Sequence, residues 1–221
     1  MDQLAKHISI DVYSDVVCPW CYVGKRRLER ALSQLHTISA QVTWRPFQLN
    51  PTMPKEGMDR TAYLEAKFGS LDAFRRLEEQ VVAAGVSERI PFAFDNIAKT
   101  PNTFLAHRLI WYAGQQGCQG AVVDALFRGY FEEGADIGSP SVLAELAGSA
   151  GLDATGFLAA DEGAAEVNAE EAAGHRLGIR AVPYFVLNNG YGISGAQPVE
   201  AFVAAITNIH ARQAERLLSR K

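Results

Sequence analysis

The sequence predicts an α/β fold with a mixed sheet and a large all-helical insertion. Three observations lead to this class: strand and helix patterns alternate at both ends of the chain, the middle reads as successive helices, and no internal repeat or low-complexity linker divides them. The 221 residues fit one large domain that carries an insertion. Because 48% of them are hydrophobic, the chain can build a packed core.

The first part of the chain reads as strand, helix, strand. In "HISIDVYS", residues 7–14, apolar and polar residues alternate with the period of a strand. From Pro19 to Leu35 the apolar residues recur at helical spacing, with charged residues between them. "QVTWRPFQLNP", residues 41–51, predicts a second strand, in which Pro46 marks a sheet edge or the end of the ladder.

A series of helices follows between about residues 58 and 165. The clearest start signal is Ser139 before Pro140, a capping residue followed by a proline at the first helical position. The five predicted helices cover residues 60–69, 70–85, 101–117, 120–134 and 139–151.

The last part of the chain returns to mixed structure. A helix over about residues 166–177 precedes "VPYFVLNNGYGISG", residues 182–195, which reads as two short strands. Asn189-Gly190 between them favours a two-residue type I′ hairpin turn. Pro198 opens a last amphipathic helix.

With the helical block removed, the order of elements is that of a thioredoxin fold. The first two strands must then be parallel with a right-handed crossover, and the hairpin adds antiparallel strands. We therefore predict a discontinuous thioredoxin-like domain, residues 1–57 and 166–221, and a helical insertion domain, residues 58–165.

Charge and hydropathy exclude several classes of partner. The formal net charge of −4 provides no basic surface for phosphates, so we expect no nucleic-acid partner. No apolar run approaches the roughly 18 residues that span a bilayer, so we expect no membrane partner. "MDQLAKHISIDVYSD" lacks the charged start and apolar block of a secretory signal, and we therefore expect a cytoplasmic protein.

Three cysteines, at positions 18, 21 and 118, do not make a disulfide framework. Two of them are close together in "SDVVCPWCYVGKRRLERAL", residues 14–32, where the strand pattern gives way to a helix. In a reducing compartment, such a pair indicates catalytic or metal-binding thiols rather than a structural bridge.

The position of the pair favours redox chemistry. Cys18 follows the first strand and Pro19 takes the first helical position, so Cys18 becomes the helix N-cap. Unpaired N–H groups and the positive end of the helix dipole then face its sulfur and favour the thiolate, the attacking species in disulfide exchange. Cys21 follows one helical turn later. We therefore expect Cys18 to attack and Cys21 to resolve.

Half of a zinc site is the main alternative for this pair. Zinc generally needs four ligands, so a second CxxC or a suitably spaced pair of histidines should appear. The rest of the chain supplies only Cys118 and five scattered histidines, none so spaced. We therefore expect no metal. An inert buried pair is disfavoured by its place between strand and helix.

Four segments and the helical insertion between them form a specific combination. Together they resemble the DsbA-like thioredoxin-fold oxidoreductases, in particular the FrnE-like branch, and the resemblance spans almost the whole chain. The four segments are "CPWC" at 18–21, "RPFQLNP" at 45–51, "NTFLAHRL" at 102–109 and "GIRAVPYFVLNNGYGISGAQP" at 178–198.

The resemblance implies the layout of the active site. Val182-Pro183 should be a cis peptide packed against Cys18, and the backbone of Val182 should pair with an extended substrate chain. Pro19 and Trp20 complete the catalytic motif between the cysteines, and Pro183 is part of the same catalytic group.

Aromatic residues near the ends of these motifs are candidates to line an apolar groove for unfolded chains. Trp20 and Tyr184 have the stronger case, because the motif fixes their positions, and we count both with Val182 as substrate-binding residues. Tyr22 is a further candidate, and Phe47 is expected in the core.

One position departs from the superfamily. Its members often carry a buried acid six residues before the first cysteine, where it can accept the proton of the resolving thiol, and here that residue is Val12. Asp11 should point to the opposite face of the strand. The proton acceptor for Cys21 is therefore Asp15 or solvent.

Three other features receive structural interpretations. Cys118 is expected to be small packing material. The resemblance implies an insertion that packs over the active site and would turn His107 toward it, but a satisfied or solvated histidine is the favoured interpretation. The charges of "KRRLER", residues 25–30, are expected to form a solvated helix face.

The residues thus predict a cytoplasmic thiol:disulfide oxidoreductase, acting as a disulfide reductase or isomerase on protein or small-molecule thiols and disulfides. Cys18 forms a mixed disulfide, and Cys21 or a substrate thiol resolves it. We expect no tightly bound cofactor beyond the redox-active disulfide itself, with glutathione or a thioredoxin system as electron partner. The chain is expected to be a monomer or a homodimer.

Two other functions remain open from the sequence. Kappa-class glutathione transferases and the related chromene-carboxylate isomerases share this inserted architecture, although they carry a serine where Cys18 stands. A peptide-binding holdase is the second alternative. A Cys18→Ser, Cys21→Ser variant that still suppressed aggregation would support it.

Overall fold

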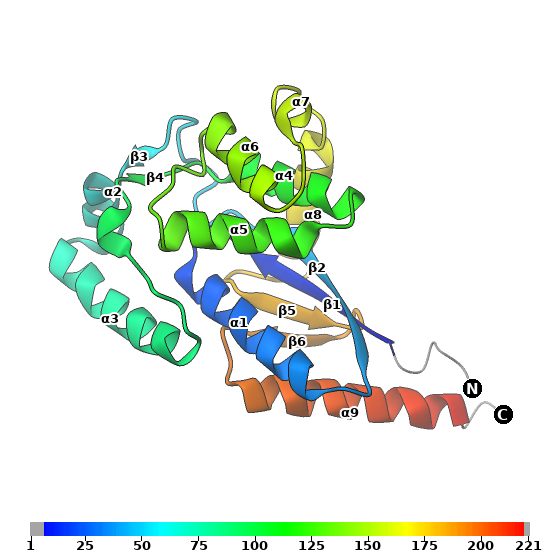
Figure 1. Ribbon diagram of the computed structural model, residues 1–221. Coiled ribbons are helices and arrows are strands. Elements are labelled where there is room, and N and C mark those ends of the chain that lie inside the picture. Colours follow the sequence, from blue (N-terminus) through cyan, green and yellow to red (C-terminus); the bar gives the residue numbers. More distant parts are fainter. Residues whose placement is uncertain (1–6, 219–221) are drawn as a thin grey trace.

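The computed structural model describes residues 7–218, with side chains up to residue 216. Its main sheet has four strands in the order β2-β1-β5-β6. Strand β1 (His7–Ser14) runs parallel to β2 (Ser39–Pro46) and antiparallel to β5 (Tyr184–Leu187), which pairs antiparallel with β6 (Tyr191–Ser194). The mixed sheet is therefore as predicted, with β1 at its centre (Figure 1).

Three helices pack against the main sheet. Helix α1 (Pro19–Gln34) connects β1 to β2 and lies beside α9 (Val199–Leu218) on one face (Figure 1). Phe185 of β5 packs edge-on against Phe202 of α9, with ring centroids 4.8 Å apart, which anchors this layer. Helix α8 (Ala164–Arg176) packs against β2.

The segment between β2 and α8 is almost entirely helical, and all five helices predicted there are present within a few residues. The sequence missed a two-stranded ladder of β3 and β4 and two short helices, because elements of two to four residues carry no periodicity. The observed elements are β3 (Met58–Asp59), α2 (Arg60–Phe68), α3 (Leu71–Ser87), η2 (Phe94–Asn96), β4 (Lys99–Thr100), α4 (Phe104–Gln115), α5 (Gln119–Phe131), α6 (Pro140–Ser149) and α7 (Thr155–Leu158).

The predicted boundary between residues 165 and 166 falls in the first turn of α8. Residues 1–6 and 219–221 of the predicted thioredoxin-like domain lie outside the described residues.

The hairpin between β5 and β6 corrects the sequence prediction by one residue. The backbone has positive φ at Asn188 (47°) and Asn189 (55°), and the N–H of Gly190 donates to the carbonyl of Leu187 at 3.1 Å. This is the pattern of a type I′ turn, centred on Asn188-Asn189 and not on Asn189-Gly190. Because Leu187 pairs with Tyr191, the loop has one residue more than a two-residue hairpin, which the identity of the dipeptide does not reveal.

One continuous hydrophobic core joins the insertion to the sheet layer through α1. The ring of Tyr22, fully buried on α1, stacks on Phe127 of α5 at 5.0 Å between centroids, with the planes 4° apart. Val12 and Leu28 from the sheet side and Leu126 from the insertion belong to the same core. The insertion therefore packs on the helix that begins at the cysteine pair.

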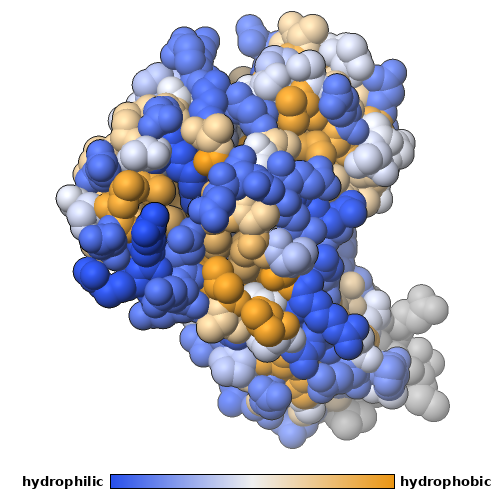
Figure 2. All heavy atoms as spheres, turned by 60° about the vertical axis from the view of Figure 1, so that its left-hand side comes forward, coloured by the Kyte–Doolittle hydropathy of each residue, from blue (hydrophilic) through white to orange (hydrophobic). Residues whose placement is uncertain are grey.

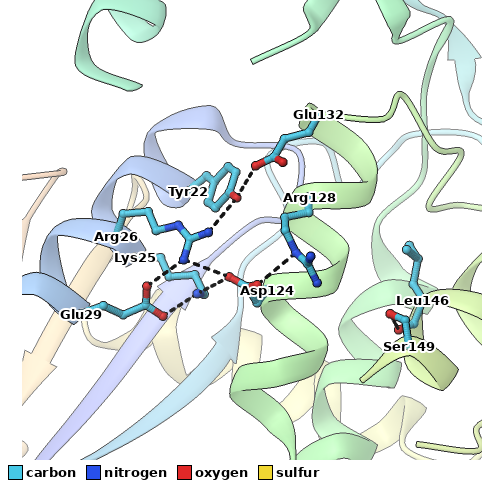
Figure 3. Close-up of polar contacts among 9 residues, drawn as sticks. All are labelled: Tyr22, Lys25, Arg26, Glu29, Asp124, Arg128, Glu132, Leu146 and Ser149. Carbon is cyan, nitrogen blue, oxygen red and sulfur yellow. Dashed lines mark hydrogen bonds and ion pairs between the residues drawn. The ribbon is translucent and has the colours of Figure 1, made fainter. Parts of the chain in front are cut away.

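Polar side chains also connect α1 to α5, and because of them the prediction of a solvated face for residues 25–30 is wrong at Lys25. Lys25 is 3% exposed, and its Nζ lies 2.5 Å from Glu29 and 2.7 Å from Asp124 of α5 (Figure 3). In the same network, the hydroxyl of Tyr22 donates to Glu132 at 2.6 Å. The charge pattern of α1 is helical, but it does not reveal that α5 covers this face.

The side of the molecule formed by α2 and α3 exposes apolar surface in patches between hydrophilic residues (Figure 2). Leu77, Val82 and Val86 of α3 are 45%, 37% and 70% exposed. Within residues 7–218, no helix is both long and apolar enough to cross a bilayer.

Candidate active site

The first cysteine lies where the sequence predicts it, at the N-cap of α1. Cys18 is extended (φ −92°, ψ 111°), and Pro19 begins the helix. The N–H of Cys18 donates to the carbonyl of Asp15 at 3.0 Å, and the N–H groups of Cys21 and Tyr22 donate to the Cys18 carbonyl at 3.0 and 3.4 Å. Both cysteines are free thiols, 6% and 1% exposed, one helical turn apart.

A second segment, distant in sequence, contacts this turn. The Val182-Pro183 peptide is cis, as the resemblance implied. The Cys18 thiol donates to the carbonyl of Val182 at 3.7 Å between sulfur and oxygen. The absence of a side chain at Gly24 lets α1 lie close to Pro183, because a Cβ at this position would lie 3.0 Å from Cγ of Pro183.

The surroundings of Cys21 favour its neutral, protonated thiol. Burial is the main factor that raises the pKa of Cys21 well above its usual range, and the neighbouring Cys18 side chain raises it further. The Ser14 hydroxyl and the backbone at Asp15 oppose this rise. The hydroxyl of Ser14 is itself buried and has no hydrogen bond of ordinary geometry. Cys21 is therefore held as a neutral thiol while the pair is reduced.

Asp15 and His107 form a buried contact between the cysteine loop and the insertion. Asp15 is 0% exposed, and one of its carboxylate oxygens, Oδ2, accepts the N–H of Leu49 at 2.7 Å. The other, Oδ1, lies 3.4 Å from Nε2 of His107 on α4, and neither of these two atoms has a hydrogen bond of good geometry. His107 is 3% exposed, so the prediction of a solvated histidine at this position is wrong.

We expect the Asp15 carboxylate to stabilise the loop that precedes Cys18. In an Asp15→Ala variant the partly buried N–H of Leu49 loses its acceptor, so the free energy of unfolding should fall by about 1–3 kcal/mol. Asp15→Asn keeps an oxygen for this N–H and should lose less. Urea denaturation of the two variants measures the difference, and equal losses would show that the hydrogen bond to Leu49 does not matter.

The remaining predicted residues are placed in different surroundings. Trp20 and Pro19 line a cavity with residues of the insertion. Tyr184 lies on the opposite face of β5 from Phe185 and packs in a second cluster with Tyr13 and Phe47. Phe47 is a core residue, as predicted. Tyr184 is thus separated from the thiols by the strand itself.

Cys118 is the N-cap of α5, half-buried, with its sulfur 3.7 Å from the carbonyl of Ala113. No three histidine, cysteine, aspartate or glutamate side chains of the described chain converge in a way that could hold a metal ion.

A family of domains, a bacterial protein and a crystal structure are each similar to most of this chain. The family of DSBA-like thioredoxin domains matches residues 9–207. The uncharacterized protein YwbO of Bacillus subtilis (strain 168) is 29% identical over 205 residues, which are 91% of this chain and 96% of that protein. The crystal structure of the probable DsbA oxidoreductase SCO1869 from Streptomyces coelicolor has a TM-score of 0.84 and 37% identity, covering 91% of this chain and 89% of that one.

A more distant similarity extends to the cytosolic disulfide reductase DsbM from Pseudomonas aeruginosa, solved with GSH. It has a TM-score of 0.62 at 16% identity and covers 95% of this chain and 98% of that one, which is a similarity of fold.

Proposed function

Because this chain belongs to the family of DSBA-like thioredoxin domains, we propose that it is a thiol:disulfide oxidoreductase whose redox centre is the Cys18–Cys21 pair. One observation carries the proposal. The Cys18 sulfur lies at the start of α1 and against the carbonyl of Val182, with Cys21 buried one turn behind it. The positive end of the helix dipole stabilises negative charge on the first sulfur.

The first step is the attack of the Cys18 thiolate on a substrate disulfide. A bond forms between Cys18 and one substrate sulfur, the substrate S–S bond breaks, and the other substrate sulfur leaves as a thiolate that takes up a proton. Pro19, Trp20 and Pro183 border the reacting sulfur, and the backbone of Val182 aligns an extended substrate.

The second step releases the substrate. Cys21 gives up its proton and attacks the Cys18 sulfur, so that the Cys18–Cys21 disulfide forms and the second substrate thiol departs. The substrate gains two electrons and two protons, and the pair loses them. Two thiols of glutathione, or a thioredoxin system, restore the dithiol. When a substrate thiol resolves the mixed disulfide instead, the net result is isomerisation.

A glutathione redox titration tests this proposal. The purified protein is equilibrated at defined ratios of reduced and oxidised glutathione, free thiols are trapped with an alkylating mass tag, and the tagged peptides are located by mass. We expect Cys18 and Cys21 to change together as one two-electron couple, while Cys118 stays alkylated throughout. Cys18→Ser is the control, and it should remove the transition.

The other outcomes are informative. Absence of a Cys18–Cys21 disulfide across the accessible range would refute the redox centre. In that case, glutathione bound without a covalent bond would favour transferase or isomerase chemistry on a small molecule, and co-purified zinc would favour a metal clip.

A further inference from the structure

A cavity of about 220 Å³ lies directly beside the cysteine motif. It lies between the loop that carries Cys18 and the side of the insertion formed by α2 and α3, the side that Figure 2 brings forward. An apolar cavity of about 150 Å³ already holds a benzene molecule, so this one has room for a substituted aromatic ring. Apolar residues that line it include Val17, Pro19, Trp20, Leu64, Phe74 and Phe131.

The place of the cavity links it to the thiols. Val17 and Pro19 are the chain neighbours of Cys18, and Trp20 stands between the two cysteines. A ligand that fills the cavity therefore contacts three residues of the segment that carries the attacking sulfur. The cavity is suited to hold part of a molecule whose sulfur reacts with Cys18.

Arg60 places a positive charge in this apolar wall. The guanidinium lies over the rings of Phe74 and Phe94, 5.5 and 5.7 Å from their centroids, and donates to the hydroxyl of Tyr130 at 3.4 Å. Within residues 7–218, no carboxylate forms an ion pair with it, in contrast to Arg45, which binds Asp11 at 2.8 Å. The Arg60 guanidinium can therefore form an ion pair with an anionic group of a ligand.

Lys67, about two turns further along α2, repeats this arrangement at the more exposed end of the cavity. Its Nζ donates to the hydroxyl of Tyr63 at 2.6 Å and to Oδ1 of Asn50 at 3.2 Å, and lies 5.2 Å from the centroid of the Tyr63 ring. All these partners are neutral, and in the described part of the chain Lys67 makes no ion pair with a carboxylate.

One acid, Glu78, also lines the cavity. Burial raises the pKa of its carboxyl and thus favours the neutral form, although the charge of Arg60 acts in the opposite direction. The side chains around the cavity therefore carry a net positive charge, with two cations against one acid.

We propose that this cavity binds the apolar, carboxylate-bearing half of a small disulfide substrate, and that the positive charges of Arg60 and Lys67 attract its carboxylate. This rests on the redox function proposed above and specifies its substrate class. The ring fills the apolar part of the cavity, which brings the attached disulfide to Cys18. The enzyme dithiol then reduces the disulfide to two thiols, and the Cys18–Cys21 disulfide forms in the same exchange.

The test compares two aromatic disulfides that differ in charge. The probe 5,5′-dithiobis(2-nitrobenzoate) has a carboxylate on each ring, and 4,4′-dithiodipyridine is neutral near pH 7.5. The pre-reduced protein is mixed with each in a stopped-flow instrument, and the ratio of the two second-order rate constants is measured. This ratio removes effects on the thiols themselves.

The variant is Arg60→Met with Lys67→Met. We expect the carboxylate-bearing disulfide to react about tenfold more slowly, which corresponds to about 1.4 kcal/mol, while the neutral disulfide changes less than twofold. Lys55→Met with Arg76→Met is the matched control, because it removes the same charge from two exposed residues outside the cavity lining, and its ratio should stay within twofold of wild type. An unchanged ratio in the cavity variant, or an equal fall for both disulfides, would overturn the proposal.

A binding measurement separates this proposal from the redox function. Calorimetry on the Cys18→Ser protein compares 2-naphthoate with the neutral 2-naphthalenemethanol, and neither requires a thiol. We expect the naphthoate to bind more tightly, with the advantage lost in Arg60→Met, Lys67→Met. Equal affinities would refute the anion site even if both disulfides are reduced, and failure of wild type to reduce either disulfide would refute only the redox function.

Discussion

A Cys21→Ser variant is expected to stop after the first step, with substrate bound to Cys18 through a disulfide. Cys21 is buried one turn behind Cys18, so it is the thiol best placed to attack the Cys18 sulfur of a mixed disulfide. A serine hydroxyl fills the same space but cannot displace a sulfur. Multiple-turnover reduction of a disulfide should therefore fall to background, while the first turnover continues.

Mass spectrometry of the intact protein measures this result as the added mass of half a substrate on the peptide that contains Cys18. Cys118→Ser is the matched control, because it removes a thiol that packs against the carbonyl of Ala113, and it should turn over normally. Wild-type turnover in Cys21→Ser would show that another thiol resolves the intermediate.

The resolving step should also depend on pH. Burial raises the pKa of Cys21, so near neutral pH only a small fraction is the reactive thiolate. Below that pKa, each unit of pH increases the thiolate fraction about tenfold, and the rate of resolution should rise accordingly. Rapid-quench measurements on the wild-type mixed disulfide give this rate, and a flat profile above pH 7 would contradict the assignment.

The second large effect concerns stability, in the network between α1 and α5 (Figure 3). In an Asp124→Leu variant, the buried ammonium of Lys25 keeps only Glu29, which is half-exposed. Removal of one partner from a buried pair typically costs about 3–5 kcal/mol, and the retained Glu29 places this variant at about 3 kcal/mol. The insertion and α1 should loosen together, because this ion pair connects them.

Lys25→Met is the matched variant and should change the free energy of unfolding by no more than about 1 kcal/mol. Its apolar side chain suits the buried position, and Asp124 keeps Arg26 and Arg128, at 3.4 and 3.1 Å. Urea unfolding measures both variants. Equal losses in the two would refute the argument that a stranded buried charge causes the effect.

Acid should weaken the same network. Burial tends to raise the pKa of Asp124, but the contacts with Lys25, Arg26 and Arg128 outweigh it, and the pKa lies below its usual value. A carboxyl with a lowered pKa stabilises the fold above its unfolded pKa of about 3.9 and loses this contribution as the pH falls through the folded value. Asp124→Asn should make this part of the acid dependence disappear.

The sequence predicts those parts of the fold and site that depend on local patterns. Alternation in residues 7–14 and the proline after Cys18 are sufficient to place β1, the start of α1 and the N-cap cysteine. The contact of Val182 with Cys18 came from the resemblance of whole motifs, and the structure contains it.

Apart from short elements and the exact hairpin turn, the features that the sequence did not predict involve contacts between distant segments. His107 and Lys25 are ordinary helix positions by pattern, and both are buried because another segment covers them. The partners, Asp15 and Asp124, lie far away in the chain, and a single sequence gives no signal that pairs them. The cavity cations Arg60 and Lys67 were missed for the same reason.

The long separation of Cys18 from Val182 has a consequence for synthesis of the protein. The two residues are 164 positions apart, and at about 5–20 residues per second the ribosome needs roughly 8–33 s to pass from one to the other. Both cysteines therefore leave the ribosome before the carbonyl and the strand that cover them in the finished fold have been made. The nascent chain therefore carries two uncovered thiols before the segment that covers them has been made.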